Sequence, residues 1–149
     1  MKKFSFSLQR LMGYKEQILD VEITVLADMN AALNGFLAEL SELESQHEQR
    51  GALLREKARA GISAVELETH KNYLTSLDFS IKQKKQQIKM QRMAIDKQMD
   101  KVREAKVEIS TMEKLREKKL EEYNYAARKA EELMIEEFVS FSRTAEASV

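Results

Sequence analysis

The side chains with the best claim to chemistry are two histidines, His47 and His70, because imidazole binds metals and exchanges protons near neutral pH. No third ligand of matching type accompanies them, whereas metal sites usually need three or four ligands. The absence of cysteine also excludes a thiolate metal site and a disulfide framework. We therefore expect both histidines on a solvated surface, with no metal and no other cofactor.

Catalysis finds little support elsewhere in the chain. The sequence has no glycine-rich phosphate loop and no cysteine nucleophile. Its carboxylates are expected along exposed helix faces, without a pocket that would shift their pKa. Two extended helices also leave almost no concave interior to hold a small substrate. These observations predict a protein that is not an enzyme.

A basic run from Lys82 to Arg92 has two interpretations. It could bind phosphates, or it could face an acidic helix and water. Nucleic-acid binders show a net basic field and often aromatic platforms, whereas this chain has a formal net charge of zero. We expect a solvated face and no nucleic-acid partner. The alternative hypothesis is a nucleic-acid-binding helical module. Retention of the protein on a polyanion, with a steep salt dependence, would favour it.

The composition indicates which elements must position these residues. The 149 residues include no proline, tryptophan or cysteine and only four glycines, and 34% of them are charged. Leu, Ala, Glu, Lys, Met and Gln dominate, and these residues lose least on entering a helix. The predicted fold class is all-α and elongated. The first 14 residues do not resemble a secretory signal and no window is apolar enough to cross a bilayer, so we expect a soluble, intracellular protein.

One stretch carries an unbroken seven-residue repeat, here called the seam. Its members are Leu67, Leu74, Ile81, Ile88, Ile95, Val102 and Ile109. A residue that returns every two turns stays on one side of a helix only when the helix supercoils against a partner. The seam therefore predicts a coiled coil.

A glycine and a capping box mark a turn between two helices. Gly61 is the type of residue that accepts the left-handed conformation just past a helix end. Ser63 and Glu66 have the spacing of a capping box at a helix start. We predict an antiparallel two-helix coiled-coil hairpin whose second helix is longer than the first, forming a single domain over residues 1–149. The predicted elements are helix one at about 8–59, a turn at about 60–63, helix two at about 63–141 and a frayed tail at 142–149.

Charge supports the same pairing. With the turn centred at residue 61, residue i lies near residue 122 minus i. Residues 16–49 contain eight acidic residues and no lysine or arginine, and their predicted partners, residues 73–106, contain nine basic and four acidic residues. This pattern favours a hairpin over a parallel homodimer, so we expect a monomer when the chain is free.

Two surfaces remain for partners. Beyond about Glu113 the second helix outruns the first and carries an apolar stripe, which is either a binding surface or an aggregation hazard. Tyr73, Ser80 and Lys84 form a second stripe, predicted to point outward and to pass close to Leu77. This second stripe is either ordinary surface or a docking face. The first stripe, the apolar one beyond about Glu113, comprises Leu115, Leu120, Tyr123, Ala127, Ala130, Met134, Phe138 and Phe141.

The order and spacing of several motifs resemble the flagellar type III export protein FliJ family over nearly the whole chain. The motifs are Phe4-Ser5-Phe6-Ser7-Leu8-Gln9-Arg10-Leu11, Tyr14-Lys15-Glu16, Gly61-Ile62-Ser63, Tyr73-Leu74-Thr75-Ser76-Leu77-Asp78, Met112-Glu113-Lys114-Leu115-Arg116-Glu117-Lys118, Arg128-Lys129-Ala130-Glu131 and Glu136-Glu137-Phe138. The resemblance implies a cytoplasmic antiparallel coiled coil, similar to the central stalk of rotary ATPases, that associates peripherally with the inner membrane at the flagellar base.

The resemblance also implies partners and the residues that bind them. The partners would be the hexameric flagellar export ATPase, the cytoplasmic linker of the membrane export gate and, for some family members, export chaperones. The residues implied for the ATPase ring are Phe4, Phe6, Leu120, Tyr123, Met134 and Phe138. Those implied for the export gate are Tyr73, Leu77, Ser80 and Lys84.

Two hypotheses therefore stand. The first is a non-enzymatic adaptor that couples the export ATPase to the export gate. The second is a self-assembling coiled-coil scaffold or interaction protein unrelated to export, in which the seam pairs between chains. Sedimentation at micromolar concentration separates them, because the hairpin predicts a monomer.

Overall fold

The computed structural model describes residues 2–148, which form two helices and no strand. Helix α1 runs over Gln9–Ala60 (52 residues) and helix α2 over Ala64–Ala147 (84 residues). The predicted fold class is confirmed: the chain is all-α, the two helices pack against each other, and the second is the longer.

The turn has the predicted glycine conformation and the predicted hydrogen bond to the serine hydroxyl of the capping box. Gly61 adopts a φ of 92°, the left-handed region that side chains with a Cβ enter only at a cost. The Ser63 hydroxyl oxygen accepts a hydrogen bond from the Glu66 N–H at 3.2 Å, and the Ser63 carbonyl accepts one from the Leu67 N–H at 3.1 Å. Ser63 therefore caps the start of α2 and satisfies donors that a helix start otherwise leaves unpaired.

Helix α2 continues past its predicted end near residue 141 and is helical through Ala147. No glycine or proline interrupts residues 142–147, and the Ser148 N–H still donates to the Thr144 carbonyl at 3.1 Å. Small and polar side chains were thus insufficient to end the helix, because alanine and glutamate favour it. The predicted frayed tail also included Val149, which lies outside the described residues.

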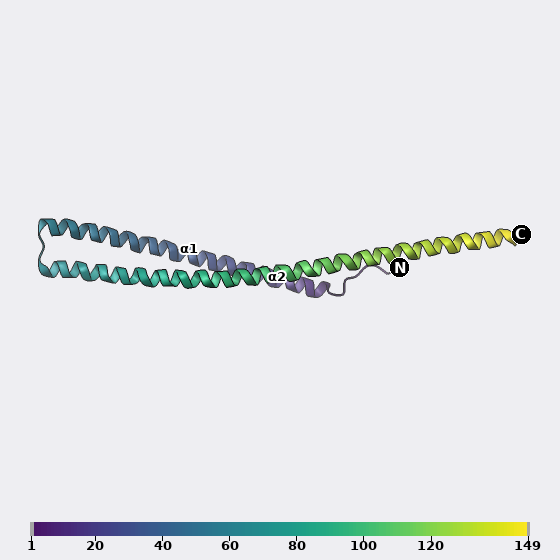
Figure 1. Ribbon diagram of the computed structural model, residues 1–149, viewed down its shortest axis with the longest axis horizontal. Coiled ribbons are helices and arrows are strands. Elements are labelled where there is room, and N and C mark those ends of the chain that lie inside the picture. The colour runs from purple at the N-terminus through teal and green to yellow at the C-terminus, as the bar shows by residue number, and fades with distance from the viewer. Residues whose placement is uncertain (1, 149) are drawn as a thin grey trace. The chain divides into compact units, whose positions relative to one another are not determined.

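The chain divides into two compact units, each containing part of both helices. The first, here called the turn unit, is Asp20–Val102. The second, the terminal unit, combines residues 1–19 with residues 103–149. Within the turn unit, α1 and α2 run side by side and are joined by the turn (Figure 1). The single domain over residues 1–149 stays a prediction.

The seam forms the core of both units. In the turn unit Ile88, Ile95 and Val102 are buried, and in the terminal unit Ile109 and Met12 are buried. Burying an aliphatic side chain of this size is worth about 1.5–3 kcal/mol. The stretch nearest the turn is less enclosed, because the other three seam residues are half-buried; they are Leu67, Leu74 and Ile81.

Polar contacts across the seam fix its register. The predicted register places Lys84 near residue 38 and Gln98 near residue 24; in the structure they bond to Glu39 and Glu22. Gln98 is only 6% exposed, and its side-chain N–H donates to the backbone carbonyl of Glu22 at 2.9 Å and also to the Glu22 carboxylate. Gln91 likewise donates to the Met29 carbonyl at 3.0 Å. The antiparallel pairing is thus confirmed to within two residues.

Candidate partner-binding surfaces

The segment before α1 packs on α2 within the terminal unit. The rings of Phe4 and Tyr123 lie with their centroids 5.6 Å apart, and the guanidinium of Arg116 lies 5.7 Å from the centre of the Phe4 ring. The Tyr123 hydroxyl donates to the backbone carbonyl of Lys2. Aromatic contact, cation–π attraction and a hydrogen bond therefore act together on this segment.

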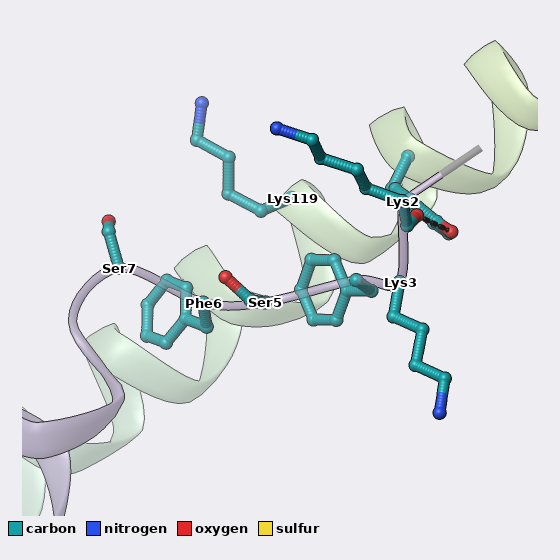
Figure 2. Close-up of a pocket in the computed structure, with 8 residues that line it drawn as sticks. Lys2, Lys3, Ser5, Phe6, Ser7 and Lys119 are labelled. Atoms are coloured by element: carbon teal, nitrogen blue, oxygen red, sulfur yellow. Dashed lines mark hydrogen bonds between the residues drawn. The ribbon is translucent and has the colours of Figure 1, made fainter.

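A hollow of about 450 Å³ opens between this segment and α2. Phe6, Lys119 and Tyr123 are among the residues that line it. Figure 2 shows Phe6 beside the α2 ribbon, with Lys2 and Lys119 extending to one side of the segment and Lys3 to the other. The hollow thus combines aromatic walls with ammonium groups at its edge.

Three of the residues predicted to bind an ATPase ring, Phe4, Phe6 and Tyr123, are brought together at this hollow. Lys119, which also lines the hollow, and Arg116, which lies over the Phe4 ring, were not among the predicted residues. Helical spacing could have found them, because Arg116 precedes Tyr123 by seven residues and Lys119 precedes it by four, which places all three on one face.

The remaining residues predicted for the ATPase lie elsewhere on α2. Leu120 is half-buried in the terminal unit. Met134 and Phe138 do not line the hollow, and each is 71% exposed. Several neighbouring large apolar side chains are also exposed: Leu133, Ile135, Val139 and Phe141. We call residues 130–142 the apolar end of α2; exposed apolar side chains gathered in this way are typical of binding surfaces.

The residues predicted to dock on an export gate differ in their surroundings. Leu77 is buried and Ser80 is half-buried. Leu77 begins a second row at seven-residue spacing beside the first, and this row is counted with the seam from here on; it consists of Leu77, Lys84, Gln91 and Gln98. Tyr73 is 40% exposed, and the Arg50 guanidinium lies 4.4 Å from the centre of its ring. Tyr73 is therefore a member of this group that a partner can reach directly.

Lys84 does not point outward as predicted. Its side chain is only 18% exposed; the ammonium lies 5.2 Å from the centre of the Phe36 ring and pairs with the Glu39 carboxylate. The reason is spacing, since Lys84 follows Leu77 by seven residues and returns to the buried side of α2. A long aliphatic stem allows the ammonium group to reach the Glu39 carboxylate from this side of the helix.

The histidines form no metal centre with their neighbours. His47 Nε2 lies 2.8 Å from the Asp78 carboxylate. Among residues 2–148, no group of three or more histidine, aspartate or glutamate side chains is arranged to hold a metal ion. The contact between His47 and Asp78 instead joins the two helices of the turn unit.

The fold and these surfaces define a two-helix coiled coil whose accessible features suit contacts with other macromolecules. The family model described as "Flagellar FliJ protein" matches residues 4–146, and the chain belongs to this family. Membership assigns the chain to flagellum biogenesis and protein export, as a structural export component rather than an enzyme. No curated protein and no solved structure matches the chain. Neither helix contains a stretch, within residues 2–148, long and apolar enough to cross a membrane.

Proposed function

We infer that the chain is a cytoplasmic adaptor that binds the hexameric flagellar export ATPase and couples it to the membrane export gate. The observation that carries this proposal is the apolar end of α2, where Met134 and Phe138 are each 71% exposed in a chain of the FliJ family. Large apolar side chains left in water favour a partner that covers them. The chain acts at the flagellar base, peripheral to the inner membrane.

The aromatic hollow extends the proposed ATPase-binding surface. Phe4, Phe6 and Tyr123 present ring surface, and Arg116 and Lys119 add positive charge. Aromatic residues and arginine are enriched among the side chains that dominate binding energy at protein interfaces. The ring of the ATPase would therefore contact both the hollow and the apolar end.

The export gate is assigned to a segment of α2 in the turn unit, around Tyr73, Leu77, Ser80 and Lys84. Tyr73 supplies the accessible ring, while buried Leu77 and half-buried Lys84 hold this part of α2 against α1. Escort of export chaperones is a further role of some family members and belongs to the same proposal. No step of the proposal requires chemistry by the chain itself.

The test is stimulation of the export ATPase by a variant with polar side chains at three positions, Tyr123→Ser, Met134→Ser and Phe138→Ser. We expect stimulation to be lost while helicity measured by circular dichroism is retained. The matched control replaces three exposed apolar residues outside the proposed surface, Val65, Phe79 and Met90, by serine. Unchanged stimulation by the first variant would refute the assignment of this end of α2.

A pull-down separates the two proposed partners. A chain truncated at Glu113 is expected to lose the export ATPase and to keep the export gate. Tyr73→Ala is expected to do the reverse, because it leaves the hollow and the apolar end intact. If both variants lose the same partner, the division of the surface is wrong.

A further inference from the structure

A groove of about 400 Å³ lies between α1 and α2 in the turn unit. Its apolar floor is formed by Leu37 and Leu40 from α1 and by Ile88 and Met93 from α2. Ile88 belongs to the buried seam, whereas Met93 is 49% exposed. The groove therefore gives a partner direct access to apolar surface at the edge of the core.

The rim of this groove is basic. Lys85, Lys89 and Arg92 line it, against one acidic residue, Asp96. None of the three cations makes an ion pair or side-chain hydrogen bond within residues 2–148, and residues 30–38 of α1 contain no charged side chain. Although the basic run was predicted to pair with the acidic helix, α1, over residues 9–60, gives these three cations no acidic partner. The groove therefore suits an acidic amphipathic helix.

The chain itself carries such a helix. At about 100° per residue, Met134, Phe138 and Phe141 share one side of α2, and Glu131 and Glu137 flank that side at about 60° in either direction. No lysine, arginine or histidine occurs within residues 130–142. The apolar end is therefore an exposed aromatic stripe with acidic borders.

We propose that the apolar end of one copy binds the basic groove in the turn unit of a second copy. Its aromatic stripe covers the groove floor, and one acidic border of the stripe, formed by Glu131 or by Glu137, faces the rim, because the cations Lys85, Lys89 and Arg92 all belong to α2. Complementary charge of this kind selects the partner and its orientation. The contact is heterologous, because it joins two different surfaces, so each copy can both offer an end and accept one.

The association is weak and reversible. One helical segment in one groove falls below the roughly 1,200 Å² that stable complexes bury. A monomer at low micromolar concentration is consistent with it, and assembly grows with concentration. Added salt weakens it, because the charges of the rim are exposed and screened.

Sedimentation equilibrium of the full-length chain tests the proposal without any other protein. We expect the average mass to rise between about 10 µM and about 1 mM, the range in which a contact with a Kd of about 0.2 mM becomes populated. Lys85→Glu/Arg92→Glu, the groove variant, and Glu131→Lys/Glu137→Lys, the end variant, are each expected to weaken association at least about tenfold.

The decisive measurement is sedimentation equilibrium of a mixture of the groove variant and the end variant. The acidic groove of one variant then meets the basic end of the other, so the mixture is expected to recover association that neither variant shows alone. Lys71→Glu/Lys97→Glu, at exposed positions outside the groove, is the charge-matched control and should associate like the unaltered chain. An unaltered chain that stays monomeric over the range, or a mixture that does not recover, overturns the proposal. Because no ATPase is present, failure here leaves the proposed export function untouched.

Discussion

Lys84 lies over the ring of Phe36, with its ammonium nitrogen 5.2 Å from the ring centre. The two residues belong to different helices of the turn unit, and the same ammonium group pairs with the Glu39 carboxylate. A single lysine thus covers an aromatic ring, fills a seam position and joins α2 to α1. Each of these contributions can be measured separately.

Two substitutions at Lys84 separate packing from charge. Lys84→Met keeps an unbranched apolar side chain over Phe36, so the free energy of unfolding should change by less than about 1 kcal/mol. Lys84→Glu places a second carboxylate beside Glu39 and should cost about 1–2 kcal/mol. Urea denaturation measures both. The pair Lys84→Glu/Glu39→Lys should recover most of the loss, and a loss that persists would show that the charge pair is not its source.

The two seam glutamines, Gln91 and Gln98, are expected to lower the stability of the coiled coil while restricting its register and its partner. Replacing Gln91 and Gln98 by leucine removes their hydrogen bonds to α1 and makes the seam more apolar. We expect thermal stability to rise by about 1 kcal/mol or more and dimers to appear at low micromolar concentration, because polar seam residues restrict register and partner choice. Thermal denaturation and sedimentation measure the two effects. Gln86→Leu, at an exposed position, is the control; a leucine variant that stays strictly monomeric would contradict this role.

Two glycines should respond to alanine in opposite directions. A Cβ at Gly35 would meet nothing within 4 Å, so Gly35→Ala should stabilise α1 by about 0.5–1 kcal/mol. Gly61 has a φ of 92°, and Gly61→Ala should cost about 1–2 kcal/mol. Chemical denaturation gives both values. Equal responses at the two positions would mean that the conformation of the turn is not what requires glycine.

The segment before α1 should depend on Phe4 more than on the Tyr123 hydroxyl. Phe4→Ala removes the ring contacts with Tyr123 and Arg116, so the amides of residues 4–8 should exchange hydrogen faster while global stability changes by less than about 0.5 kcal/mol. Tyr123→Phe removes only the hydrogen bond to the Lys2 carbonyl and should have a smaller effect. Hydrogen exchange read by mass spectrometry ranks the two; the reverse order would make the hydrogen bond the main contact.

Periodicity and turn chemistry were enough to predict the fold. Gly61 and Ser63 marked the turn because each supplies a backbone feature that few residues offer. The repeat from Leu67 to Ile109 identified the buried side of α2, and the turn position then set the register to within two residues, as the contact between Gln98 and Glu22 shows. These signals are local or strictly periodic, so one sequence contains them.

Side-chain direction at polar seam positions was harder to predict. Lys84 was assigned to an outward stripe from its spacing with Tyr73 and Ser80, but its ammonium group lies over the Phe36 ring of α1. Spacing could have placed Arg116 on the same face as Tyr123, but its contact with Phe4, more than one hundred residues away in sequence, could not be predicted in this way. Contacts between distant segments carry no spacing signal of their own.

A strict seven-residue repeat would let two helices slide, because a shift by one repeat again sets aliphatic side chains against each other. Lys84 makes the observed alignment of the helices more stable than the alignments shifted by seven residues. A shift in one direction would bring Ala32 to the place of Glu39, and a shift in the other would bring Gln46 there, leaving a largely buried ammonium without its carboxylate. Lys84 therefore resists sliding of the two helices. A force applied along α2 in the turn unit is transmitted to α1, because sliding would break the Lys84–Glu39 pair.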